Sequence, residues 1–359
     1  MLKFCFKSNY YNLILLLLLS FTAKLAFVFY SAYLIKAYAL HDVYYNHYFY
    51  VKTYHFLFMG LFSLSFFILP FLYLYVREIS SKKIIIFCFI IQIISNLFFC
   101  YFNNFIVLFF SILGASLINV ILIIVIVQIV SLVSYKNQLW VLALAHAFSF
   151  TFSLTIFKEL YSFDYDVKNF LYISILLSIV GIFLAFSLIL NNDIAKVANR
   201  HFTNYIFVGI FATVRKSKSF IFYLIILSAL ATIHIIVESY KLDVSYTYPN
   251  NYTDTILLLF ITTLMIVIIS IIANIISPIT IFSIIGFLYI FISIFIIKDY
   301  NSRIIIFSDK IISLSVLSLW ISLLLRNFLN IFAKYRFFAI GSLYLFVNVL
   351  TWFTVKILS

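Results

Sequence analysis

The feature that most constrains the fold is a run of 52 residues, Ile84–Tyr135, without a single Asp, Glu, Lys, Arg or His. As one α-helix this run would be about 78 Å long, whereas the hydrocarbon core of a bilayer is about 30 Å thick. The run therefore holds two membrane-spanning helices, and Asn103-Asn104 is the polar turn between them. We predict these helices over Ile84–Phe102 and Phe105–Val133.

Long apolar runs also fill the rest of the chain. Hydrophobic residues make up 66% of the 359 residues and charged residues 10%, whereas about a quarter of the residues in soluble domains are charged. The sequence therefore predicts an all-α polytopic membrane protein with 11 or 12 transmembrane helices in two bundles. The Tyr- and His-rich segment Tyr38–Lys52 is predicted to be the first loop. The other predicted helices are Asn12–Tyr33, Thr53–Val76, Leu139–Phe157, Asn169–Leu190, Phe220–Val237, Thr255–Ile276, Ile279–Ile297, Ile304–Leu325 and Phe337–Ile357.

The longest polar stretch, Asn191–Ser219, divides the chain into two halves. It contains the apolar segment Phe202–Val214, which is too short to span a bilayer and is expected to lie at the membrane interface. We predict an N-terminal bundle of six helices over residues 1–190, a cytoplasmic linker over 191–219, and a C-terminal bundle of about five helices over 220–359.

The basic residues indicate how the chain is oriented. Of the 24 Lys and Arg residues, 14 fall on one side when loops are assigned alternately, eight on the other, and two within helices. Because cytoplasmic loops carry an excess of Lys and Arg, this bias predicts a cytoplasmic N-terminus and an external C-terminus. The net charge of +13 is explained by these helix-end residues, so no nucleic-acid partner is expected. We expect the protein in the inner (cytoplasmic) membrane of a bacterium.

A short charged segment, Tyr73–Lys83, connects the second and third predicted helices and reads YLYVREISSKK. This basic turn resembles the loop between helices 2 and 3 of the major facilitator superfamily, which usually reads Gly-x-x-x-Asp-Arg-x-Gly-Arg-Arg/Lys. Tyr73 stands at the first glycine and Ser80 at the second, and the Asp-Arg pair is replaced with its charges reversed. The charged residues of the basic turn are Arg77, Glu78, Lys82 and Lys83.

A second resemblance to this family lies in the predicted fourth helix. Transporters of the family often show Arg-x-x-Gln-Gly-x-Gly there, and Gly114 and Ser116 stand at the two glycine positions, with Phe110 at the arginine position. Leu144–Ser153, in the fifth helix, lacks the Gly and Pro residues of the family's antiporters. The resemblance covers about residues 12–190, and the remainder matches only in layout. It implies two bundles that rock about a midplane site, and a monomer.

Ionisable residues away from helix ends are the best candidates for a site, because a charge at the bilayer centre costs about 2.5–3.5 kcal/mol or more. Lys24 lies near the middle of the first helix. It is expected to bind an anionic group of a solute or to pair with a proton site. The alternatives are that it faces lipid on a displaced helix or forms a structural pair. His146, in the fifth helix, is a candidate for proton relay or solute binding, the alternative being a packing histidine.

Two further sets of residues are candidates for gating. His234 and Glu238 are four residues apart at the outer end of the seventh helix, so they share one helix face and form either an external proton gate or an ordinary helix-end pair. The four charged residues of the basic turn are expected to form ion pairs that favour one access state, or simply to anchor the loop on the cytoplasmic side. Cys5, Cys88 and Cys100 have no metal-binding spacing, so no metal site is expected.

The function that the sequence predicts is secondary active transport of a small solute across the cytoplasmic membrane by alternating access, with proton coupling as an option. No Gly-x-x-x-x-Gly-Lys-Ser/Thr motif for ATP is present, and no cofactor or catalytic residue is expected. One alternative is a membrane enzyme that acts on lipid-linked sugars, although the largest external loop, Glu238–Asp254, has only 17 residues. A second alternative is a degenerate carrier. The expected partners are a small-molecule solute and the lipid bilayer.

Overall fold

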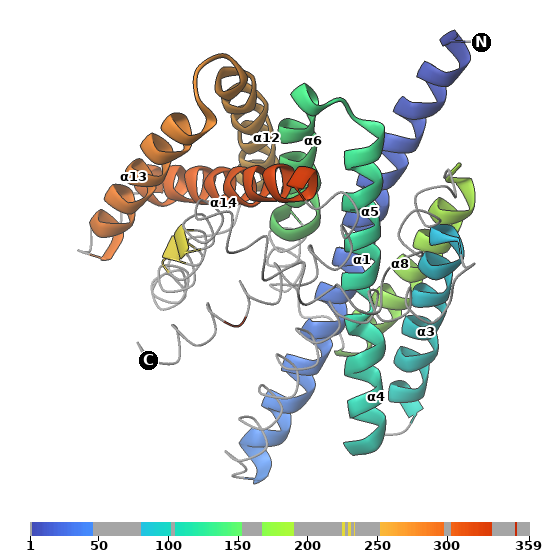
Figure 1. Ribbon diagram of the computed structural model, residues 1–359. Coiled ribbons are helices and arrows are strands. Elements are labelled where there is room, and N and C mark those ends of the chain that lie inside the picture. Colours follow the sequence, from blue (N-terminus) through green and yellow to red (C-terminus); the bar gives the residue numbers. More distant parts are fainter. Residues whose placement is uncertain are drawn as a thin grey trace, which may run out of the picture. The chain divides into compact units, whose positions relative to one another are not determined.

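The computed structural model describes the backbone of residues 2–45, 80–101, 105–152, 167–189, 252–297 and 303–331, with single positions at 225–226, 229–230, 233 and 349. Within these residues the chain forms helices joined by short turns and no strand (Figure 1). The helices are α1 (Leu2–Tyr45), α3 (Ser81–Tyr101), α4 (Phe105–Ser116), α5 (Ile118–Leu132), α6 (Tyr135–His146), the π-helix η1 (Ala147–Phe152), α8 (Val167–Ser187), α12 (Tyr252–Ile275), α13 (Pro278–Ile297) and α14 (Arg303–Ile331).

The apolar runs predict most of these helices well. Helices α3, α8, α12, α13 and α14 each begin within three residues of the predicted start, and the turn at Asn103-Asn104 falls between α3 and α4. The predicted helices Thr53–Val76, Phe220–Val237 and Phe337–Ile357 lie outside the described residues apart from the single positions named above. The count of 11 or 12 membrane spans and the division at residues 191–219 therefore stay predictions.

The first helix is longer than predicted. Helix α1 has 44 residues and continues through Tyr45, so the predicted loop Tyr38–Lys52 is wrong over its first eight residues. The segment between Leu34 and Tyr45 contains no Gly or Pro, and nothing in it stops helix propagation. Apolar character therefore marks the part of α1 that fits a membrane, and does not mark where the helix ends.

The predicted fourth and fifth helices are interrupted in ways that the sequence does not show. Leu117 separates α4 from α5, and its N–H donates to the Gly114 carbonyl at 3.2 Å, which tightens this turn. Helix α6 begins four residues before the predicted Leu139, and six residues of π-helix come after it, within the predicted span of helix 5. A π-helix carries an extra residue per turn and is frequent at functional sites.

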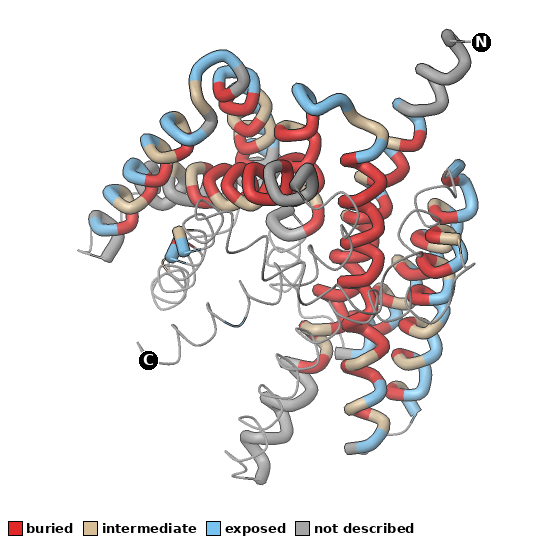
Figure 2. The backbone as a smooth tube through the Cα atoms, viewed as in Figure 1, coloured by how far each residue is buried: buried red, intermediate tan, exposed pale blue. Residues whose placement is uncertain are grey.

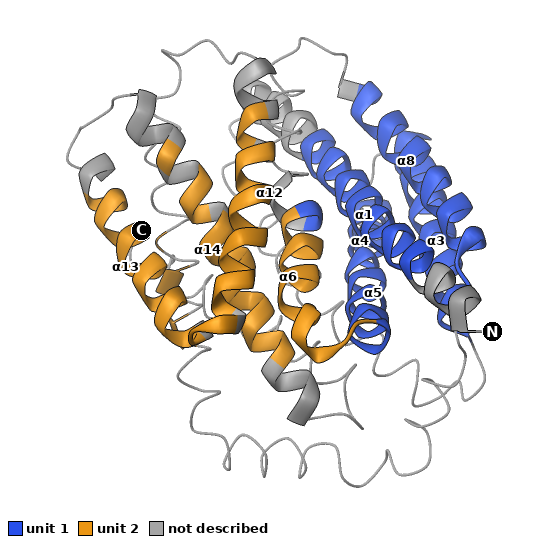
Figure 3. Cartoon of the chain, turned by 90° about the horizontal axis from the view of Figure 1, so that it is seen from above, with its two compact units in different colours: residues 1–132, 148–206, 334–345 blue, residues 133–147, 207–333, 346–359 orange. Residues whose placement is uncertain are grey.

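The chain divides into two compact units, coloured blue and orange in Figure 3. Unit 1 comprises residues 1–132, 148–206 and 334–345, and unit 2 comprises the rest. In unit 1, α1 packs against α8 and α5, and α3 packs against α8, α4 and α5. Helix α5 is buried from Ile118 to Val130, whereas α3 and α8 alternate between buried and exposed positions (Figure 2).

In unit 2, α14 packs against α6, α12 and α13, and α12 also contacts α6 and α13. The indole Nε1–H of Trp320 on α14 donates to the Phe282 carbonyl of α13 at 3.3 Å, and their rings lie 5.9 Å apart. Helix α6 belongs to this unit although its neighbours in sequence, α5 and most of η1, belong to unit 1.

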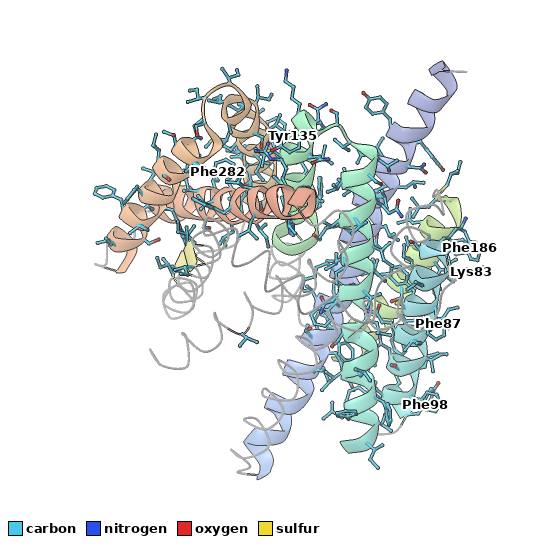
Figure 4. The ribbon with its side chains drawn as sticks, in the orientation of Figure 1. Lys83, Phe87, Phe98, Tyr135, Phe186 and Phe282 are labelled. Carbon is cyan, nitrogen blue, oxygen red and sulfur yellow. The ribbon has the colours of Figure 1, made fainter. Side chains whose placement is uncertain are left out.

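Four helical segments in the described part of the chain are long and apolar enough to cross a membrane. They are Tyr10–Leu34, Ser81–Tyr101, Ile106–Leu132 and Lys168–Ser187. Large apolar side chains such as Phe87 and Phe98 on α3 and Phe186 on α8 are more than half exposed (Figure 4). Lipid covers such faces favourably, and they mark the outer surface of unit 1.

Candidate functional site

Lys24 is buried in the middle of the membrane-length part of α1. Its side chain is 6% exposed, and its Nζ lies 4.8 Å from the centroid of the Phe27 ring one turn further on. An ammonium group over an aromatic ring gains a cation–π attraction, which strengthens where water is excluded. Lys24 lies about 21 Å along the helix from Tyr10 and about 15 Å from Leu34. The charge therefore stands near the middle of this segment, as predicted from the sequence.

The other faces of α1 are occupied by helix contacts. The Tyr30 hydroxyl lies 2.7 Å from the Ser111 hydroxyl of α4, and Leu25 and Phe29 pack on Phe170 of α8. With about 100° between successive residues, Lys24 lies on a third face of α1, turned away from α4 and from α8.

This third face of α1 also carries hydroxyl groups. Ser20 Oγ donates to the Leu17 carbonyl at 2.8 Å and Ser31 Oγ donates to the Phe27 carbonyl at 2.9 Å. Because each hydroxyl hydrogen is used within the helix, the oxygen lone pairs of these serines lie on the same face as the positive charge of Lys24. The face is therefore suited to an anionic or proton-donating group near Lys24.

His146 is buried in unit 2, with 3% of its side chain exposed. It is the last residue of α6, directly before the π-helix, and the chain passes from unit 2 to unit 1 between Ala147 and Phe148. Lys24 and His146 thus belong to different units. The position of His146 at a helix irregularity is compatible with proton relay or solute binding and also with a packing role.

The described end of the basic turn is tied to α8. Lys82, in the first turn of α3, donates from Nζ to the carbonyls of Phe186 at 2.5 Å and Leu188 at 3.1 Å. The last carbonyls of a helix lack partners within it and carry partial negative charge, so a lysine there is stabilising. Lys83 is exposed (Figure 4). The described contacts of Lys82 are therefore those of a helix cap. Arg77 and Glu78 lie outside the described residues.

A second contact fastens α8 to the start of α1. The Asn12 side chain donates from Nδ2 to the Ile189 carbonyl at 2.8 Å, and its Oδ1 accepts from the Ile189 N–H at 3.1 Å. The beginnings of α1 and α3 and the end of α8 therefore meet at one end of unit 1. The predicted topology also places these three ends on one side of the membrane, and its assignment of that side to the cytoplasm stays a prediction.

Gly114 lies where α4 approaches α3 closely. A Cβ at this position would overlap both the Oγ and the Cβ of Ser95 on α3. Gly181 of α8 is similar, since a Cβ there would overlap the Phe89 ring of α3. Small residues let membrane helices approach each other, so both glycines serve the packing of α3.

A buried polar stripe joins α3, α8 and α1. Asn96 Nδ2 donates to Ser174 Oγ at 3.1 Å, and Ser174 Oγ donates to the Ala26 carbonyl at 2.7 Å. Gln92 lies one turn before Asn96 and is 1% exposed, yet neither atom of its amide has a hydrogen-bond partner among the described residues. Asn96 Oδ1 likewise has no hydrogen-bond partner among the described residues. The stripe holds two outer helices to an inner one, and Gln92 is the member whose whole amide is unsatisfied.

The structure reveals one contact that sequence reasoning misses. Arg326, on α14, is 6% exposed, and its guanidinium carbon lies 4.9 Å from the centroid of the Tyr135 ring at the start of α6 (Figure 4). In the sequence Arg326 is one of many basic residues that come after an apolar run, and the positive-inside bias assigns it to cytoplasmic anchoring. No sequence signal distinguishes it from an anchoring residue, because its burial depends on a helix that begins 191 residues earlier in the chain.

Two predicted site residues, His234 and Glu238, lie outside the described residues. Among the residues that are described, no group of three His, Cys, Asp or Glu side chains is placed to hold a metal ion. The structure therefore places two buried candidate residues, Lys24 and His146, and three basic residues near helix ends, Lys82, Lys83 and Arg326.

Comparison with known proteins identifies the fold. No protein-family model matches the sequence, and no curated protein matches it significantly. The human organic anion transporter MFSD10 (TETRAN) superposes with a TM-score of 0.65 at 11% identity, over 96% of this chain and 91% of that one. A bacterial homologue of the iron transporter ferroportin, in an outward-facing state, gives 0.60 at 17% identity, over 95% and 91%. This chain is an all-α membrane protein that shares the fold of these two solved structures, as the resemblance to the major facilitator superfamily predicts.

Proposed function

We propose that this protein is a secondary active transporter that moves a small solute across the cytoplasmic membrane by alternating access. The observation that carries the proposal is the major facilitator fold over nearly the whole chain, together with a buried lysine in the middle of its first helix. Both solved structures named above are transporters, one of organic anions and one a homologue of an iron transporter. In this fold two bundles rock about a central site. We assign the bundles to residues 1–190 and 220–359, with residues 191–219 as the linker.

Lys24 is the residue that we assign to the solute or to its coupling ion. A buried charge is expensive in a membrane, so it is retained where it has a function. An anionic group such as a carboxylate or phosphate would form a charge-assisted hydrogen bond with the Lys24 ammonium. Alternatively, the side chain titrates and couples transport to protons, with His146 as a relay and the pair His234 and Glu238 as the external gate.

The cytoplasmic gating loop in this proposal consists of the four charged residues of the basic turn, Arg77, Glu78, Lys82 and Lys83.

The decisive experiment is solute counterflow in proteoliposomes containing the purified protein. A panel of monocarboxylates, organic phosphates, neutral sugars, amino acids and divalent metals is offered with and without a proton gradient. We expect accumulation of at least one anionic solute, and a loss of tenfold or more in the variant Lys24→Ala. The matched control is Lys168→Ala, which removes an exposed lysine that has no assigned role in gating and leaves transport within about twofold of wild type.

The outcomes separate the candidate functions. Stimulation of uptake by an inward proton gradient supports coupling, whereas exchange without any gradient effect argues against it. A facilitator tolerates loss of the loop acid Asp243 and does not tolerate loss of Lys24, while a membrane enzyme acting on lipid-linked sugars shows the reverse. If no solute of the panel accumulates with the folded wild-type protein, the transport proposal is contradicted and a degenerate carrier is favoured.

The proposed orientation is tested with reporters fused after Lys83, Lys168, Lys218 and Asp254. A cytoplasmic N-terminus and a six-helix first bundle require the pattern inside, outside, inside, outside. Reporters at Lys83 and Lys218 on opposite sides would contradict the six-helix bundle.

A further inference from the structure

Helix α6 stands apart from the rest of the first half of the chain. It lies between α5 and η1 in sequence, yet residues 133–147 cluster with residues 207–333 in unit 2. There α6 packs against α14 and α12. The contact between α6 and α14 therefore joins a helix of the predicted N-terminal bundle to a helix of the predicted C-terminal bundle.

The start of α6 is held to α14 by a cation on an aromatic ring. The Arg326 guanidinium lies 4.9 Å from the Tyr135 centroid, and Arg326 is almost fully buried although Tyr135 is 56% exposed. A guanidinium stacked on tyrosine is attractive by about 0.5–2 kcal/mol, with larger values where water is excluded. The exposed ring therefore covers a cation that belongs to the neighbouring helix.

An irregularity in the helix lies at each end of α6. Before it, the helix breaks at Val133 and Ser134, and Gln138 Nε2 donates back to the Val133 carbonyl at 3.1 Å. After it, the chain continues into the π-helix Ala147–Phe152, and the Ala147 N–H still donates to the carbonyls of Ala143 and Leu144. Residues 133–147 therefore form an arm with an irregularity at each end.

We propose that the pair Arg326–Tyr135 is a cytoplasmic latch, which holds this arm against α14 in the closed arrangement of the cytoplasmic side and must part when that side opens. The inference rests on the proposed transport function and on the predicted topology, which places Tyr135 and Arg326 at cytoplasmic helix ends. When two bundles rock about a central site, contacts between them at the closed end break on opening. The latch adds a barrier to that step and assigns Arg326 a positioning role.

The latch is tested by the reactivity of a cysteine placed behind it. Leu139 is fully buried and lies one turn from Tyr135 on the same face of α6. We use Leu139→Cys as the reporter in a protein in which Cys5, Cys88 and Cys100 are alanine. A membrane-impermeant maleimide is applied from the cytoplasmic side. Two controls are the exposed position Asn137→Cys, and Ile85→Cys, which is buried in α3 of unit 1.

We expect Tyr135→Leu and Arg326→Gln each to raise the labelling rate of the Leu139 reporter roughly fivefold, which corresponds to the loss of one such contact. Tyr135→Phe keeps the ring and labels at the wild-type rate. Because the two residues act through each other, the double variant labels no faster than either single variant. The Asn137 and Ile85 reporters stay unchanged in all of them.

Each other result overturns the latch. Wild-type labelling in both single variants, or additive effects in the double variant, shows that the Arg326–Tyr135 contact does not hold α6 against α14. Faster labelling of the Ile85 reporter as well shows general loosening rather than release of α6. If Arg326→Gln fails to fold, Arg326→Lys and Tyr135→Leu decide the question in the same assay. Labelling needs no solute, so a working latch without transport contradicts only the proposed function, and transport without a latch contradicts only this inference.

Discussion

The inner and outer helices of unit 1 are equally apolar and yet differ in how they are covered. In the 18-residue apolar stretches of α1 and of α4 with α5, 72% and 89% of the residues are buried, against 39% and 33% in those of α3 and α8. The inner helices are buried over most of their surface, and the inner helix α1 carries the buried charge Lys24. The outer helices have one contact face and one face of large exposed side chains. Sequence hydrophobicity marks all four helices, but it does not separate inner from outer.

The contact faces of the outer helices show what holds them in place. Lipid is as apolar as leucine, so the hydrophobic effect does not drive helices together within the bilayer. Helix α3 is instead held by close approach at Gly114 and Gly181 and by the hydrogen bond from Asn96 to Ser174. A few small or polar residues therefore decide where an outer helix packs, whereas the rest of its surface tolerates any large apolar side chain.

The largest effect is expected from a charge on the lipid face. Leu176 is 61% exposed near the middle of α8, so Leu176→Arg places a guanidinium against lipid at mid-depth. We expect a loss of about 2.5–3.5 kcal/mol, seen as a sharp fall in membrane-inserted, monodisperse protein. Tyr101→Arg is the control, because this 80% exposed residue ends α3, where an arginine reaches the headgroups. Equal yields from both variants would mean that this face of α8 does not meet lipid.

A smaller loss is expected where α4 meets α3. In Gly114→Ala the new Cβ overlaps the Ser95 Cβ, which a side-chain rotation does not relieve, so the two helices must separate. We expect a destabilisation of about 1–3 kcal/mol, measured by thermal unfolding in detergent. Gly286→Ala in α13 is matched to it, because the nearest atom there is Trp320 Nε1 at 3.7 Å, an ordinary contact. That variant is expected to be neutral or more stable by up to about 1 kcal/mol. Equal losses would show that Gly114 acts through helix propensity and not through packing.

Two amides on one face of α3 give the next test. Asn96→Leu removes a hydrogen bond between helices and leaves Ser174 with one partner fewer, at an expected cost of about 1 kcal/mol. Gln92→Leu removes a buried amide that has no hydrogen-bond partner among the described residues, so it is expected to be neutral or stabilising. Unfolding midpoints of the two variants in the same detergent are compared. A larger loss for Gln92→Leu would show that Gln92 gains a partner in solution that this arrangement lacks.

These two amides also show which features of the fold can be predicted from the sequence. Charge-free apolar runs and the asparagine pair at 103–104 are enough to place α3, α8, α12 and α13, because a membrane fixes the length of an apolar helix. Spacing also shows that Gln92 and Asn96 share a helix face. It does not show that only Asn96 meets a serine, because that depends on how α8 lies against α3. For the same reason the sequence misses the break at Leu117.

The candidate residues divide in the same way. The position of Lys24 is predictable, because a charge inside an apolar run can be recognised in the sequence alone. The structure places this residue at the expected position along α1. The cap made by Lys82 and the contact made by Arg326 are not predictable, because both residues have the appearance of membrane anchors. Their partners, the end of α8 and the start of α6, lie 104 and 191 residues away in the sequence. These contacts depend on how distant helices pack together, which the sequence pattern does not show.

The smallest effect is expected at the end of unit 1 where inner and outer helices meet. Lys82→Gln removes the ammonium group that donates hydrogen bonds to two carbonyls at the end of α8. Lys83→Gln removes a neighbouring exposed charge that makes no such contact among the described residues. We expect a loss of about 0.3–1 kcal/mol for Lys82→Gln, because a cation at a helix C-terminus contributes about that much, and no measurable change for Lys83→Gln. Both variants lose one positive charge from the same loop, so anchoring on the cytoplasmic side predicts equal effects. Hydrogen exchange of the peptide that ends at Ile189 separates the two explanations: a cap predicts faster exchange only in Lys82→Gln, whereas anchoring predicts the same profile in both variants.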